Sequence, residues 1–120
     1  FLKTIKKIKI IHPIILIVSS KLLKSQMAKL KIYKKINILN NQNFLKLKFS
    51  KNFINIYDVN YNSKKGLIKS SIKSNNYLKS CFKIAFTILR KYKFEKFING
   101  PIVKKTFLKK KIFRNYGIYI

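Results

Sequence analysis

Acidic side chains are almost absent from this 120-residue chain, in which Asp58 and Glu95 are the only two. They lie far apart in the sequence and no pattern pairs them. Acid–base catalysis and divalent-metal binding commonly rely on paired carboxylates, so the chain is poorly equipped for either. Asp58 follows an apolar run, where an α/β sheet can present a carboxylate to a ligand. A turn or a helix cap also favours aspartate, and we consider that role more frequent.

Cysteine and histidine are equally scarce, with Cys81 and His12 as single representatives. An internal disulfide is therefore excluded, as is a metal site built from several Cys or His ligands of this chain. Cys81 falls on the apolar side of a helical pattern, which favours a packed, unreactive thiol. His12 precedes Pro13, and we expect a structural or incidental role. The longest apolar run, residues 13–18, is far shorter than the roughly 18–20 residues of a membrane span, so no membrane is expected as a partner.

The scarcity of acids leaves a formal net charge of +27. Such a charge favours RNA or DNA as a partner, and Tyr33, Tyr57, Tyr61 and Tyr92 are available for base stacking. However, only two of the 29 basic residues are arginines, which nucleic-acid surfaces commonly recruit. The lysines are spread over every segment, and an AT-rich coding sequence produces the same composition. We therefore interpret the charge mainly as a solvated surface, whose self-repulsion lowers stability at low salt.

The first half of the chain carries short, β-branched apolar runs. Residues 13–18 predict a strand that is buried on both faces. Ser19 or Ser20 can then cap a helix with apolar residues at spacings of four and three, namely Leu23, Met27 and Leu30. Three further strands are predicted at residues 36–39, 45–49 and 53–57. Because a strand leads directly into a helix, the fold class is α/β, a partial layered sheet with flanking helices.

The second half changes to a helical period over residues 70–91. Its apolar residues fall on one arc of the helix (Leu78, Cys81, Phe82, Ala85, Ile88 and Leu89), opposite Lys79, Lys83, Thr87 and Arg90. Residues 97–98 predict a brief strand, and residues 104–111 predict a short helix. No linker divides the chain, so residues 1–120 are expected to form a single, incomplete α/β domain.

Residues 99–105, Asn-Gly-Pro-Ile-Val-Lys-Lys, are the one segment with the pattern of a ligand site. Gly100 and Pro101 interrupt the predicted strand and expose backbone amides, and Lys104 follows at the start of the predicted helix. Amides at a helix N-terminus together with an ammonium group can cradle an anion such as phosphate. A simple Gly-Pro turn explains the same residues, so both interpretations remain open.

The same segment carries a family resemblance. Residues 97–109, Phe-Ile-Asn-Gly-Pro-Ile-Val-Lys-Lys-Thr-Phe-Leu-Lys, resemble the Gly-Pro-Ile-x-Lys stretch of 4-hydroxythreonine-4-phosphate dehydrogenase, an enzyme of vitamin B6 (pyridoxal phosphate) biosynthesis. Residues 13–30 resemble the early strand and helix of that family, and residues 62–89 resemble its loop and long helix before the Gly-Pro strand. The resemblance covers most of this chain and about the first third to half of the enzyme.

The resemblance implies an oxidoreductase that uses NAD and a divalent metal to oxidise a phosphorylated hydroxy-amino acid. It also implies a cytoplasmic homodimer with an isocitrate-dehydrogenase-like α/β fold and an active site between domains and subunits. Gly100, Pro101 and Lys104 match the Gly-Pro-x-x-Lys positions, and Gly117 matches the glycine of a following Gly-His-Thr-Glu motif. These four residues are the candidate substrate or anion contacts.

The chain also departs from the family. The glycine-rich opening segment has no counterpart, and Ile118 and Tyr119 stand where the family has the substrate-binding His and Thr. The metal-binding histidines lie further along the family's chain, and Val103 replaces a polar residue before the lysine. We therefore expect a truncated or divergent N-terminal fragment with no catalytic or metal-binding residues, no activity and no cofactor by itself.

Two alternatives to a dehydrogenase fragment follow from the charge. The first is a small, lysine-rich RNA-binding or ribosomal protein, supported by the net charge and the scattered tyrosines. The second is a basic protein of membrane surfaces, which has less support because the apolar arc of the long helix is needed for a core.

Overall fold

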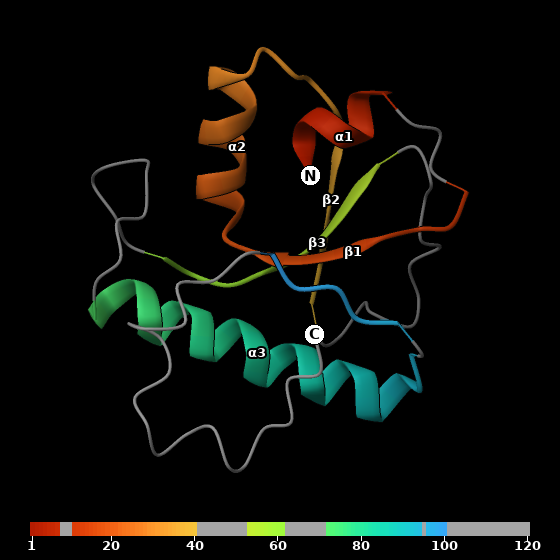
Figure 1. Ribbon diagram of the computed structural model, residues 1–120, viewed down its shortest axis with the longest axis vertical. Coiled ribbons are helices and arrows are strands. Elements are labelled where there is room, and N and C mark those ends of the chain that lie inside the picture. The colour runs from red at the N-terminus through yellow and green to blue at the C-terminus, as the bar shows by residue number, and fades with distance from the viewer. Residues whose placement is uncertain (8–10, 41–52, 62–71, 95, 101–120) are drawn as a thin grey trace. The chain divides into compact units, whose positions relative to one another are not determined.

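The computed structural model describes residues 1–7, 11–40, 53–61, 72–94 and 96–100. The chain divides into two compact units, from Phe1 to Leu67 and from Ile68 to Ile120. Among the described residues, two helices and three strands belong to the first unit, and helix α3 belongs to the second (Figure 1). The single domain expected over residues 1–120 remains a prediction.

The first unit is built on a parallel sheet with helices, which confirms the predicted α/β class. Strands β1 (Ile15–Val18), β2 (Ile36–Leu39) and β3 (Ile54–Asp58) are arranged in the order β1-β3-β2, and β3 pairs in parallel with both neighbours. Helix α2 (Ser20–Lys29) connects β1 to β2. Strand β3, the last of the three described strands, therefore lies between β1 and β2.

One face of this sheet carries the core of the unit. Helix α1 (Leu2–Lys7) buries Leu2 and Ile5, and these pack in one cluster with Leu23 and Met27 of α2. The cluster is completed by Ile32, Ile54 and Ile56. Since Ile54 and Ile56 are two residues apart on β3, they point to the same face of the sheet. Both helices therefore cover that face.

Helix α1 was not predicted from the sequence. Its two buried residues are three positions apart, which is a helical spacing. Three lysines share the six-residue helix with them, and a pattern this short has no periodicity to distinguish it from a basic N-terminal segment.

Strand β1 corrects one expectation. The strand is present, but its four residues are all half-buried, and Pro13 and Ile14 before it are exposed. The expectation of a strand buried on both faces was therefore wrong. A run of β-branched residues indicates a strand, but its place in the sheet decides its burial, and here the central place belongs to β3. Ile54, Asn55 and Ile56 of β3 are accordingly buried.

A polar ladder crosses the sheet at Asn55, which is fully buried. The Asn37 side-chain amide on β2 donates to Asn55 Oδ1 at 3.0 Å, and Asn55 Nδ2 donates to the Ile14 carbonyl at 3.3 Å. Asn37 and Asn55 are register partners in the β2–β3 pair. Because a buried amide is costly without hydrogen bonds, this ladder favours one register over a slipped one.

Helix α3 (Ile72–Tyr92) confirms the helix predicted over residues 70–91. The side chains predicted to lie on its polar side, Lys79, Lys83, Thr87 and Arg90, are exposed. The buried residues are Ser74, Tyr77, Ala85 and Ile88. Ser74 and Tyr77 were not expected among them, because one is small and polar and the other lies at the margin of the apolar arc.

The strand predicted at residues 97–98 was wrong, because this backbone is irregular and Ile98 is 94% exposed. The strand predicted at 45–49, most of the turn and loop around 41–43 and 62–66, and the helix predicted at 104–111 lie outside the described residues. Within the described ranges, no helix combines the length and the apolar character needed to cross a membrane.

Candidate anion-binding segment after helix α3

Among the four predicted site residues, Gly100 is described, and Pro101, Lys104 and Gly117 lie outside the described residues. Gly100 is exposed, and the Asn99 side-chain amide donates to its carbonyl oxygen at 3.2 Å. Its φ is not positive, and a Cβ placed on it would meet no atom of the described residues within 4 Å. Neither backbone conformation nor packing therefore demands glycine here, so a need for glycine would come from a closely approaching ligand.

The approach to this segment begins where α3 ends. Lys93 has a φ of 52°, the left-handed conformation that commonly terminates a helix. Phe97 then contacts two phenylalanine rings of α3: its ring centroid lies 6.0 Å from that of Phe82 and 5.7 Å from that of Phe86. Phe82 and Phe86 in turn stack on each other at 6.1 Å. The chain therefore reverses at Lys93 and returns along the helix, as the blue segment of Figure 1 shows.

The length of the chain between Tyr92 and Phe97 limits how far back along α3 it can reach. A helix rises about 1.5 Å per residue, so the point midway between Phe82 and Phe86 lies about 12 Å back from Tyr92. The chain from Tyr92 to Phe97 reaches at most about 17 Å when fully extended. Gly100 can in turn lie no more than about 10 Å from Phe97. The three rings consequently restrict the position of Gly100 along α3.

The carboxyl end of the sheet in the first unit offers a second place for a ligand. There the Ser20 backbone N–H donates to Asp58 Oδ1 at 2.7 Å. Ser19 is the N-cap of α2, and its Oγ accepts from the Leu22 N–H at 3.4 Å. The Asp58 carboxylate thus satisfies a free amide at the positive end of α2. The capping interpretation of Asp58, and the prediction that Ser19 or Ser20 caps this helix, are confirmed.

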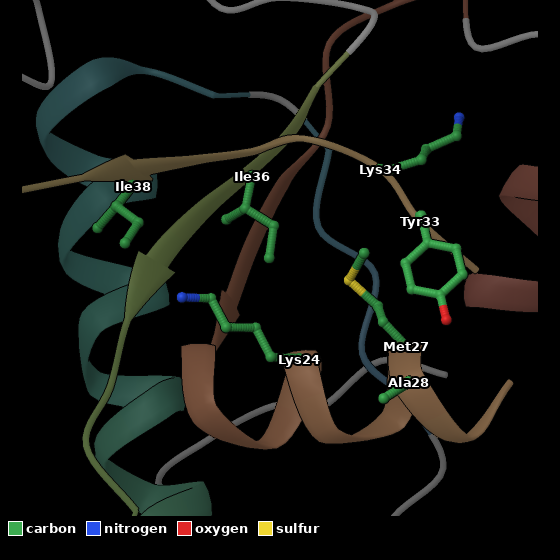
Figure 2. Close-up of a pocket in the computed structure, with 7 residues that line it drawn as sticks. All are labelled: Lys24, Met27, Ala28, Tyr33, Lys34, Ile36 and Ile38. Atoms are coloured by element: carbon green, nitrogen blue, oxygen red, sulfur yellow. The ribbon is translucent and has the colours of Figure 1, made fainter. Parts of the chain in front are cut away.

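An open pocket of about 380 Å³ lies between α2 and β2 (Figure 2). Figure 2 shows the Met27 side chain rising from α2 on the side where Ile36 extends from β2, while the Lys34 side chain leads away. Lys34 Nζ approaches the Ile5 carbonyl at 3.5 Å, the long end of the hydrogen-bond range. The remaining lining residues are Lys24, Ala28, Tyr33 and Ile38. No carboxylate, imidazole or thiol is among these lining residues, so the titratable groups at this pocket are those of Lys24, Lys34 and Tyr33.

Cys81 and His12, the two other candidate reactive residues, are not among the residues of the pocket or of the α2 cap. Cys81 is half-buried and free; burial raises the pKa of its thiol above the ordinary value, and a hydrogen bond with Tyr77 opposes that rise. A raised pKa favours the protonated thiol at neutral pH, and an unreactive Cys81 stays a prediction. His12 is exposed, and Glu95 lies outside the described residues. The described part of the chain contains no group of three or more His, Cys, Asp or Glu that could hold a metal ion.

The four tyrosines considered for base stacking differ in accessibility. Tyr33 is 82% exposed, whereas Tyr61 is only 9% exposed, and Tyr57 and Tyr92 are half-buried. Tyr61 is therefore not available for stacking. The described residues leave Tyr33 as the single well-exposed member of this set.

Comparison of the chain with protein-family models, with curated proteins and with solved structures finds no match. What this protein does must therefore be inferred from its residues and their geometry.

Proposed function

We propose that this chain is part of an enzyme of the 4-hydroxythreonine-4-phosphate dehydrogenase type, in which it helps to bind the phosphate group of the substrate. The whole enzyme would transfer a hydride from the substrate to NAD, within a homodimer. The described residues offer no cluster suited to the divalent metal that the resemblance implies. The role proposed for this chain is accordingly binding, and no chemical step is assigned to its residues.

The order of elements supports this proposal. Strand β1 and helix α2 occur where the resemblance expects the early strand and helix, and α3 occurs where it expects the long helix. The Gly-Pro pair follows α3, again as the resemblance requires. The sheet is parallel, as it is in α/β enzymes. We further propose that the whole enzyme has an isocitrate-dehydrogenase-like architecture.

Phosphate binding at the Gly-Pro segment has a physical basis in these residues. The missing side chain of Gly100 lets a ligand approach the backbone closely, and the lysine at position 104 adds a positive charge. Residues 72–105 contain one carboxylate, that of Glu95, against nine basic residues, so the net charge of this stretch favours an anion. Positive charge is present throughout the chain, so the segment is distinguished by the exposed glycine at position 100, which a lysine follows four positions later in the sequence, rather than by charge alone.

A site-resolved titration tests the proposal. We expect 4-hydroxythreonine 4-phosphate to shift the Gly100 amide resonance saturably at about 150 mM salt, which screens non-specific binding. Unphosphorylated 4-hydroxythreonine should produce no such shift. Lys104→Met should weaken binding by about tenfold or more, since a charge-assisted hydrogen bond contributes about 1.5–3 kcal/mol.

The matched control is Lys105→Met, which removes the same charge one residue further on and should change affinity by less than about twofold. Equal losses in the two variants would mean non-specific attraction and contradict the proposal. Formation of NADH by the chain alone is not expected, because Ile118 and Tyr119 replace the His and Thr of the family. Selective binding of one RNA structure over bulk RNA would instead favour the RNA-binding alternative.

A further inference from the structure

Three phenylalanine rings join the segment before Gly100 to helix α3. Phe82 and Phe86 lie one helical turn apart and stack with an interplanar angle of 26°. The Phe97 ring meets Phe82 edge to face at 66° and meets Phe86 at a tilt of 46°. These separations and angles are those of favourable aromatic pairs. The contacts are non-local, since Phe97 belongs to the chain that follows the helix.

We propose that Phe82, Phe86 and Phe97 are positioning residues for the Gly100 backbone, and that they hold residues 97–100 at one place along α3. This inference rests on the proposed function. The rings do not touch the ligand. They act through the backbone, because Gly100 is only three residues from Phe97 and the chain between Tyr92 and Phe97 has little slack.

The exposed fraction of Phe97 indicates that its ring positions the following residues and is not part of a buried core. Phe97 remains 43% exposed, and its neighbour Ile98 is 94% exposed. A ring that is nearly half in water contributes much less to the stability of the unit than a buried ring would. Its contact with Phe82 and Phe86 nevertheless determines where the next residues lie. The main consequence of losing Phe97 should therefore appear in binding rather than in folding.

The physical mechanism is pre-organisation. Without the ring contacts, the residues up to Gly100 would sample many positions, and the ligand would have to order them when it binds. The conformational entropy of ordering is then lost in the binding step. We expect phosphate affinity to fall by about tenfold or more, which corresponds to ordering one or two residues.

The test compares alanine and leucine variants of the full chain. Phe97→Ala should weaken binding of 4-hydroxythreonine 4-phosphate by about tenfold or more, measured at the Gly100 amide. Phe97→Leu keeps an apolar contact with the α3 rings and should retain affinity within about threefold. Phe94→Ala is the matched control, because Phe94 is 39% exposed and its ring packs 6.5 Å from Tyr92. Its affinity should stay within about twofold, since Phe94 is not among the three positioning rings.

The outcomes separate the two proposals. Wild-type affinity in Phe97→Ala, or an equal loss in Phe94→Ala, would overturn the positioning role and leave the proposed function intact. No saturable binding by the wild-type chain would overturn both. The melting temperatures of the two alanine variants should be similar. A much larger drop for Phe97→Ala would assign Phe97 to the core instead, and would also overturn the inference.

Discussion

The first unit contains side-chain hydrogen bonds between residues that are far apart in the sequence, whereas those within helix α3 join residues one turn apart. In the first unit, Ser20 pairs with Asp58 and Asn55 pairs with the Ile14 carbonyl. In α3, the Ser80 hydroxyl donates to the Asn76 carbonyl, and Thr87 and Arg90 each bond the carbonyl four residues before them. The sheet unit therefore depends on tertiary pairing, while α3 follows from its local pattern.

The apolar contacts of the two units differ in the same way. Seven buried residues from α1, α2, β3 and the α2–β2 connection form the core of the first unit. In the second unit, α3 buries Tyr77, Ala85 and Ile88, and the less buried rings of Phe82, Phe86 and Phe97 join the helix to the chain that follows it. The buried residues of both units stabilise the fold, whereas the three rings hold a short segment in place. Mutations of the core residues of the first unit should therefore affect stability, and mutations of the three rings should affect binding.

The largest loss of stability is expected from Ile56→Ala. Ile56 has no exposed surface and lies on the central strand, so its truncation leaves a cavity that neighbouring elements cannot easily fill. We expect the free energy of unfolding to fall by about 3–4 kcal/mol, measured by urea denaturation. The contrasting variant is Ile72→Ala at the start of α3, where the side chain is 81% exposed; a change within about 0.5 kcal/mol is expected. Similar losses in both variants would contradict the comparison.

A smaller loss is expected when the polar ladder is broken. Asn55→Ala removes the hydrogen bonds to Asn37 and to the Ile14 carbonyl, and leaves a cavity at a fully buried position. The expected cost is about 2 kcal/mol. Asn37→Ala should cost less, because Asn37 is only half-buried. Hydrogen exchange of the β3 amides measures the effect, and unchanged protection in Asn55→Ala would show that the ladder does not stabilise the register.

Removing the carboxylate at the start of α2 should cost about 1 kcal/mol. Asp58→Ala deletes the acceptor of the Ser20 N–H and a negative charge at the helix N-terminus. Asp58→Asn retains a side-chain oxygen that can accept this bond, so it should recover about half of the loss. Equilibrium denaturation of the two variants provides the measurement. Identical stability of Asp58→Ala and the wild type would mean that water replaces the carboxylate without cost.

The smallest expected effect is a pH dependence from Cys81. Burial raises the pKa of this thiol in the folded chain above its ordinary value of 9.0. The unfolded chain therefore releases the thiol proton first as the pH rises, and the free energy of unfolding falls from about pH 9 upward until the folded value is passed. Comparison with Cys81→Ala isolates this contribution from other titrating groups. A wild-type chain that gains stability relative to Cys81→Ala over this range would reverse the sign and contradict the burial argument.

Local patterns allowed several elements to be predicted correctly. Helix α3 was predictable because its apolar residues recur every three or four positions over many turns. Strands β2 and β3 were predictable from short apolar runs, and the cap of α2 from Ser19-Ser20 after a strand. Helix α1 was missed, because six residues that include three lysines carry no repeated pattern. The strand predicted at 97–98 was wrong, because an apolar pair does not show whether a neighbouring strand is present to bond it.

In the candidate site, too, some residues could be identified from local sequence patterns and others only from tertiary contacts. Gly100 and the lysine at position 104 could be identified from the sequence, because a Gly-Pro pair interrupts the predicted strand and a lysine follows it. The return of Phe97 to Phe82 and Phe86 could not be predicted, since contacts between side chains separated by a turn leave no periodic signal. Asp58 was undecided between capping and ligand binding until its contact with the Ser20 amide was seen.

The sequence by itself determined the α/β class, the long helix and the scarcity of groups for acid–base or metal chemistry. Those properties depend on composition and on spacings within one segment, which a chain carries whatever its fold. Only the tertiary structure decided that β3 lies between β1 and β2, that β1 is half-buried, and that three rings restrain the segment before Gly100. Each of these depends on which distant segments come together, and the energies of such contacts are shared between residues that no local pattern connects.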